Sequence, residues 1–106
     1  MYELMAADVS AVMDALRIEK AGLVGWSDGA AIALILARTA PTRVAGVFYF
    51  ACNMDPSGAK QITELSPIIA RCLSRHTKDY AQLSATPDQF GAFAEAVGLM
   101  QRTEPN

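Results

Sequence analysis

Several residue types and patterns are scarce in this sequence, and each scarcity excludes a class of protein. Nine Lys and Arg against eleven Asp and Glu leave a formal charge of −2 and no basic surplus, which argues against a nucleic-acid binder. The longest apolar run, residues 30–37, is far shorter than a membrane span. Glu3 and Asp8 interrupt the only apolar start, so we expect no signal peptide.

Cysteine and histidine are also rare. The two cysteines, Cys52 and Cys72, are typical of reduced core residues in a cytosolic chain. The one histidine, His76, restricts any chemistry that needs an imidazole to a single position. What is abundant is apolar: 52% of the 106 residues are hydrophobic, enough to exclude intrinsic disorder. The length and composition therefore predict one globular unit in the cytoplasm, with a modest core.

The first half of the chain predicts a βαβ unit behind an amphipathic helix. That helix covers residues 2–18, and its buried stripe is expected to be Met5, Val9, Val12, Met13 and Leu16. Residues 21–25 are an apolar run without alternation, which predicts a strand that is buried on both faces. Residues 44–51 are β-branched and aromatic, which predicts a second strand. Residues 30–40 between them are apolar all round, which predicts a buried helix that ends at Pro41. Strand, helix and strand with short links form a right-handed crossover of two parallel strands.

The second half predicts two or three helices. Residues 53–58 are rich in turn formers and predict a loop. Helical spacing then runs from Ile62 to Arg75, with Pro67 splitting the helix and Ser66 as a new N-cap. Residues 86–89 match a capping box, which predicts that a last helix begins there.

The pentapeptide Gly25-Trp26-Ser27-Asp28-Gly29 matches G-x-S-x-G between the first predicted strand and the buried helix. In a nucleophile elbow this turn is so sharp that the serine backbone is strained, and both glycines avoid collisions with neighbouring backbone. The serine Oγ then projects beside a helix N-terminus, whose N–H groups and dipole favour an oxyanion. The alternative is that Ser27 is only the N-cap of a buried helix. Residues 22–29 fit neither a dinucleotide fingerprint nor a P-loop.

Residues 5–58 resemble the elbow region of the α/β-hydrolase family, and the GWSDG elbow is most similar to that of the valacyclovir-hydrolase-like serine hydrolases. The resemblance implies that Ser27 is the nucleophile and that the backbone N–H of Asp28 is an oxyanion donor. It also implies that Trp26 and the Asp28 side chain contact substrate, with Asp28 recognising a substrate amino group. Residues 80–105 are similar to the end of that family's helical cap.

A serine hydroxyl needs a base, and the family places its acid and its histidine after later strands. The sequence therefore predicts a partial domain whose base comes from outside these residues. Ser27, Asp55 and His76 do occur in the family's order and form an alternative triad, although Asp55 before Pro56 and Ser57 also fits a turn or N-cap residue. A metal site made by Cys52, Cys72 and His76 is a weak alternative, because structural zinc is usually bound by four protein ligands. We expect no cofactor and no metal.

A sheet of only two parallel strands is rarely stable by itself, because both of its faces must be covered by other elements and both of its edges carry unpaired backbone groups. The fold class predicted is thus a partial α/β-hydrolase domain over residues 1–106, with an elbow-bearing core over 1–52 and a cap-like helical segment over 53–106. We expect a homodimer or higher oligomer. The predicted function is that of part of a serine hydrolase acting on small-molecule esters or related acyl compounds. The alternative is a non-catalytic interaction module that keeps this scaffold.

Overall fold

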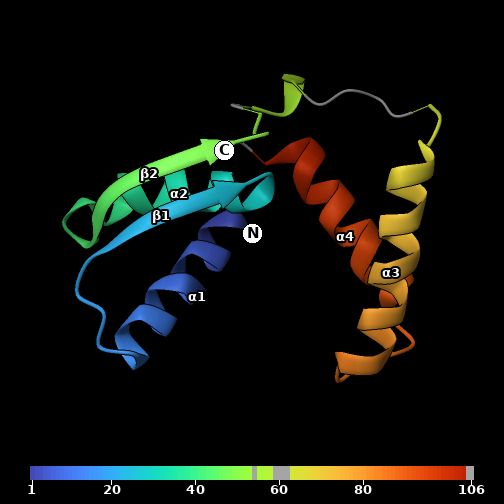
Figure 1. The fold of residues 1–106 in the computed structure, drawn as a ribbon, viewed down its shortest axis with the longest axis horizontal. Helices are drawn as coiled ribbons and strands as arrows, with labels where there is room; N and C mark the ends of the chain where they lie inside the picture. Colours follow the sequence, from blue (N-terminus) through green and yellow to red (C-terminus); the bar gives the residue numbers. More distant parts are fainter. Residues whose placement is uncertain (54, 59–62, 105–106) are drawn as a thin grey trace. The chain divides into compact units, whose positions relative to one another are not determined.

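The computed structural model describes residues 1–53, 55–58 and 63–104. Contacts divide the chain into two compact units, one within Met1–Ala59 and Arg102–Asn106 and the other within Lys60–Gln101. Figure 1 shows the elements of each unit. In the part of the chain that is described, no helix combines the length and the apolar character needed to cross a bilayer.

The first unit contains the predicted βαβ arrangement. Helix α1 (Tyr2–Ala15) precedes strand β1 (Ala21–Trp26), helix α2 (Asp28–Thr39) and strand β2 (Val44–Phe50). The two strands pair in parallel, in a register that runs from Gly22 opposite Gly46 to Trp26 opposite Phe50. Helix α2 packs against both strands and α1 packs against α2 (Figure 1). The predicted partial α/β fold is confirmed.

Helix α2 is the central, buried element of the first unit. Its buried residues are no more than 5% exposed: Ala30, Ala31, Ala33, Ile35 and Leu36. A helix that is apolar all round must be covered on more than one side, and here the sheet and α1 supply that cover. Pro41 follows the helix and begins the short 3₁₀ turn η1 (Pro41–Arg43). The predicted buried helix is therefore confirmed.

Helix α1 ends earlier than predicted, at Ala15 instead of Ile18. Arg17 adopts a positive φ of 57°, the conformation that usually stops a helix at a glycine. The Ile18 N–H donates to the Met13 carbonyl (2.8 Å) and the Arg17 N–H to that of Asp14 (3.0 Å), as in a Schellman motif. No glycine marked this end, so apolar spacing alone extended the helix too far.

The buried stripe of α1 also differs from the predicted one. Tyr2, Ala6 and Met13 are 4–6% exposed, whereas Val12 and Leu16 are 58% and 64% exposed. The stripe is rotated toward a tyrosine and an alanine because α1 packs on the alanine-rich surface of α2. Ranking residues by hydrophobicity gave too little weight to small side chains, which allow two helices to approach closely.

One face of the sheet is open. Val24 and Trp26 on β1 lie on the same face as Phe48 and Phe50 on β2, because side chains alternate along each strand and these residues pair in register. They are 49–79% exposed, although Trp26 stacks on Phe50 with ring centroids 6.5 Å apart. The prediction of a strand buried on both faces is wrong for this side of β1. We call these four residues the aromatic sheet face.

The second unit is built from helix α3 (Pro67–Leu83) and most of helix α4 (Phe90–Thr103). The predicted N-cap is confirmed, because the Ser66 Oγ accepts a hydrogen bond from the Ile69 N–H (3.3 Å) and Pro67 opens the helix. Ile62, where helical spacing was expected to begin, lies outside the described residues. The helix continues past Arg75, the predicted end, for two more turns.

The link between α3 and α4 contradicts the predicted capping box. The Gln89 N–H donates to the Thr86 carbonyl (3.0 Å), so residues 86–89 form a turn with Pro87 at its second position, where proline is favoured. The Thr86 Oγ1 is within hydrogen-bond distance of the Tyr80 hydroxyl (3.0 Å) instead of capping a helix. Helix α4 starts only at Phe90, and the Tyr80 ring lies against Phe90 and Phe93.

The cysteines are free, but they are not both core residues. Cys52 is partly buried and Cys72, on α3, is exposed. No residue of α3 is buried in the described structure, so the helical spacing that includes Cys72 does not correspond to a buried stripe. The prediction of a core cysteine is wrong at this position.

The corrected stripe of α1 can be tested with two neighbouring residues. We expect Met13→Ala to lower the free energy of unfolding by at least about 2 kcal/mol, because it leaves a cavity between α1 and α2. Val12→Ala, one position away but exposed, should change it by less than about 0.5 kcal/mol. Urea denaturation followed by circular dichroism measures both. Equal losses would contradict the observed rotation of the helix.

Candidate active site

Ser27 lies at the junction of β1 and α2 in a strained backbone conformation. Its φ is 54° and its ψ is −125°, in a region that a residue with a side chain rarely adopts. The Ser27 N–H continues the sheet ladder by donating to the Phe50 carbonyl (3.2 Å), while its own carbonyl accepts from the Ala30 N–H (2.9 Å). A single residue thus ends the strand and begins the helix. Strain of about 1–3 kcal/mol persists only where the surroundings enforce it.

Gly25 makes this sharp turn possible. A Cβ built on Gly25 would lie 2.6 Å from both the Ala30 Cα and the Gly29 carbonyl oxygen. These are backbone atoms and cannot rotate away, so only glycine fits. Gly29 behaves differently, because a Cβ there meets no atom within 4 Å. The prediction that both glycines prevent collisions is therefore confirmed for Gly25 and wrong for Gly29.

Asp28, the first residue of α2, is joined to α1 by a side-chain hydrogen bond. The Tyr2 hydroxyl donates to the Asp28 Oδ1 (2.9 Å), and Tyr2 is only 4% exposed. Burial raises the pKa of the Tyr2 phenol well above its ordinary range, and the hydrogen bond and negative charge of Asp28 raise it further. Sequence reasoning missed Tyr2. The available signal was a tyrosine at the start of the helix predicted to precede the βαβ unit.

Cys52 lies just after β2, close enough to Asp28 for the negative charge of that residue to affect the ionisation of the Cys52 thiol. Burial, and then the negative charge of Asp28, raise the pKa of the Cys52 thiol. The thiol donates to the Asn53 carbonyl (3.2 Å). A protonated thiol is a poor nucleophile, which argues against Cys52 as the reactive group. Trp26, on the other side of Ser27 in the chain, belongs to the aromatic sheet face and is 68% exposed.

Asp55 has the structural role that its neighbours suggested. Its Oδ1 accepts from the Ser57 N–H (2.8 Å) and from the Ser57 hydroxyl, at the start of the 3₁₀ turn η2 (Pro56–Gly58). These hydrogen bonds, the one from the hydroxyl first, lower the pKa of the Asp55 carboxyl. The interpretation of Asp55 as a turn residue is confirmed. Its carboxylate is directed to Ser57.

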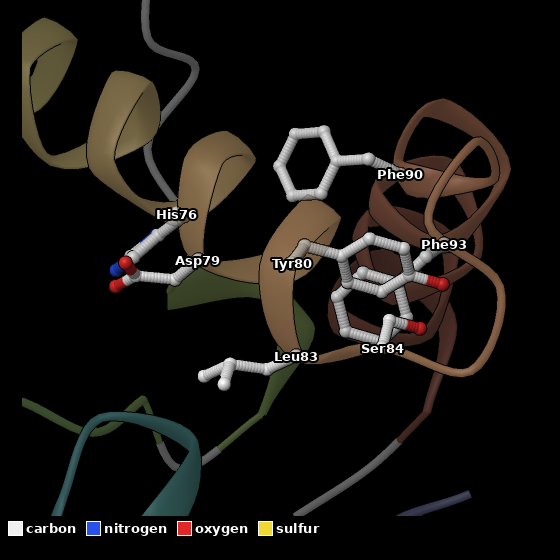
Figure 2. A pocket seen from close by; sticks show the side chains of 7 residues that line it. All are labelled: His76, Asp79, Tyr80, Leu83, Ser84, Phe90 and Phe93. Atoms are coloured by element: carbon white, nitrogen blue, oxygen red, sulfur yellow. The ribbon is translucent and has the colours of Figure 1, made fainter.

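His76 lies on α3 in the second unit, whereas Ser27, Asp28 and Asp55 belong to the first. It is exposed and borders an open hollow of about 370 Å³ between α3 and α4. Figure 2 shows His76 and Asp79 on one side of this hollow and the rings of Tyr80, Phe90 and Phe93 on the other. Asp79 forms an ion pair with Arg75 (3.6 Å), one turn earlier on the same helix.

A family model described as the alpha/beta hydrolase fold matches residues 2–97, which is most of the chain. The chain belongs to the α/β-hydrolase family. A comparison with curated proteins gave no match. The parallel pairing of β1 and β2, which flank α2 in the sequence, agrees with this family assignment. The matched residues extend over both units of the structure.

Within this α/β-hydrolase chain, the described structure brings Tyr2 to Asp28, which follows Ser27 and opens α2, while the ring of Trp26 lies on the aromatic sheet face. The Asp55 carboxylate bonds to Ser57, and His76 belongs to the second unit while Ser27 and Asp55 belong to the first. The described residues do not contain a group of three or more His, Cys, Asp or Glu side chains arranged to hold a metal ion.

The requirement for glycine at position 25 can be tested against a second glycine on the same strand. We expect Gly25→Ala to lower the free energy of unfolding by about 3 kcal/mol, because the new methyl group overlaps backbone atoms of α2. Gly22→Ala is the matched control, since a Cβ there meets nothing within 4 Å and should cost less than about 0.5 kcal/mol. Chemical denaturation measures both. A Gly25→Ala protein as stable as the control would contradict the close contact between β1 and α2.

Proposed function

We propose that this chain carries the nucleophile elbow of a serine hydrolase that cleaves esters or related acyl compounds. The observation that carries the proposal is the strained backbone of Ser27, with a φ of 54° at a strand-to-helix turn. Strained backbone of this kind clusters at active sites, whereas an N-cap serine ordinarily adopts extended backbone. Ser66, the N-cap of α3, has the ordinary geometry, with φ −62° and ψ 153°.

In the proposed reaction the Ser27 Oγ attacks the substrate carbonyl carbon and its proton passes to a base. The backbone N–H of Asp28, next in the chain and first in α2, donates to the resulting oxyanion, which the helix dipole also favours. The base returns the proton to the leaving alcohol, and water then releases the acyl group from Ser27. We propose that the base is a histidine outside these 106 residues, because the α/β-hydrolase family places its histidine after a later strand than the two described here.

The finer resemblance to valacyclovir-hydrolase-like enzymes supports a proposal about substrate. Asp28 is partly buried beside Ser27, and one of its carboxylate oxygens accepts from Tyr2. We propose that this carboxylate also attracts an amino group on the substrate and that the exposed Trp26 ring contacts its apolar part. An amino-acyl ester is the substrate class that fits both residues.

A fluorophosphonate probe tests the nucleophile. We expect it to label Ser27, with phosphorus bonding to Oγ as fluoride leaves, slowly in the chain alone and several-fold faster with added imidazole as an external base. Ser27→Ala should abolish the labelling, and His76→Ala should leave it unchanged. Peptide mass spectrometry identifies the labelled residue and its rate.

The outcomes of the labelling experiment separate the candidate functions. Labelling lost in His76→Ala would overturn the proposed external base and favour the self-sufficient triad of Ser27, Asp55 and His76. Absence of labelling at Ser27 even with imidazole would overturn the hydrolase proposal. That result would favour the second candidate, a non-catalytic interaction module.

The aromatic sheet face favours this second candidate function. Phe48 and Val24 are 67% and 79% exposed, and a row of such residues on one face is unusual for a monomer. Within the described residues both outer edges of the two-stranded sheet also lack a neighbouring strand. We propose that copies of the chain associate through this face or these edges.

Self-association can be measured directly. We expect light scattering at micromolar concentration to give a dimer or a larger species, and Phe48→Ser to weaken association about tenfold, as for an interface aromatic residue. Leu83→Ser is the control, because Leu83 is 85% exposed but lies on α3. A monodisperse monomer in the unchanged chain would rule the proposal out.

A further inference from the structure

The hydrogen bond between Tyr2 and Asp28 joins elements that are far apart in the chain. Tyr2 is the first residue of α1, Asp28 is the first residue of α2, and the bond between them is 2.9 Å long. The Tyr2 backbone is held as well, because its N–H donates to the Glu104 Oε2 (3.1 Å). With only 4% of Tyr2 exposed, its hydroxyl is held in place by packing.

We propose that Tyr2 is a positioning residue of the elbow, whose hydroxyl holds the Asp28 carboxylate and thereby keeps the turn at Ser27 in its strained geometry. Its catalytic meaning rests on the proposed function. The other restraints on this turn are backbone hydrogen bonds to β2 and within α2, through Phe50 and Ala30. Tyr2 adds a restraint from α1.

The hydrogen bond from Tyr2 also affects how the negatively charged Asp28 carboxylate is oriented. A carboxylate in the first turn of a helix readily accepts hydrogen bonds from the N–H groups there. In that orientation it would compete with a developing oxyanion for the same donors and repel its negative charge. By donating to Oδ1, Tyr2 holds this carboxylate oxygen toward α1. The raised pKa of the Tyr2 phenol keeps it protonated, and hence a donor, throughout the neutral range.

Amide hydrogen exchange in the intact chain tests the proposal without needing activity. Tyr2→Phe removes only the hydroxyl, so we expect exchange at residues 28–31 to accelerate about five- to tenfold, as for loss of one hydrogen bond. The amide of Leu36, in the middle of α2, should be unaffected. The matched control is Tyr80→Phe, which removes a hydroxyl paired with Thr86 in the second unit.

Two further variants separate positioning from a general loss of packing. Asp28→Ala should accelerate the same amides, and adding Tyr2→Phe to it should have no further effect, because both changes remove one interaction. Asp28→Asn keeps an oxygen acceptor and should retain most of the protection. Unchanged exchange in Tyr2→Phe, or equal acceleration throughout α2, would overturn the proposal.

The same variants can be labelled with the fluorophosphonate probe. We expect Tyr2→Phe to lower the maximal rate of labelling several-fold while the probe concentration for half-maximal rate stays unchanged. If no variant is labelled but exchange accelerates locally, the hydrolase proposal fails and Tyr2 still positions the turn. If the unchanged chain is labelled and Tyr2→Phe alters neither exchange nor rate, the hydrolase proposal stands and the role of Tyr2 is refuted.

Discussion

The close contact between β1 and the start of α2 is the constraint on which the first unit depends. Gly25 has no side chain, and the backbone of Ala30, which is fully buried, occupies the space where one would lie. This approach removes any linker between strand and helix. Ser27 therefore carries the whole reversal in one residue, and the strain at its φ of 54° is the consequence.

The turn at Ser27 is held from several directions, and each comes from a different part of the sequence. Phe50 on β2 accepts from its N–H, Ala30 on α2 donates to its carbonyl, and Tyr2 on α1 bonds to the neighbouring Asp28. A strained residue survives only in such surroundings. Contacts from α1, α2 and β2 thus hold one local geometry, the turn at Ser27, in which a serine begins a helix.

Local chemistry predicted some features well and others poorly. Ser66 before Pro67 predicted an N-cap, and Asp55 before Pro56 predicted a turn, because both depend on hydrogen bonds within a few residues. The capping box at Thr86 failed although its residue types were right. There, hydroxyl groups on α3 and in the following loop, including that of Tyr80, compete for the same threonine, and only packing decides between the partners.

Apolar runs and the G-x-S-x-G spacing act through near neighbours, so the sequence was enough to predict the βαβ unit and the strand-to-helix turn at Ser27. The tertiary structure alone decided which face of α1 is buried, which sheet face stays open and that Tyr2 meets Asp28. These features follow from how layers pack, and the sequence separation of Tyr2 and Asp28 leaves no local pattern to read. The same packing shows that Gly25, and not Gly29, is the glycine that the turn requires.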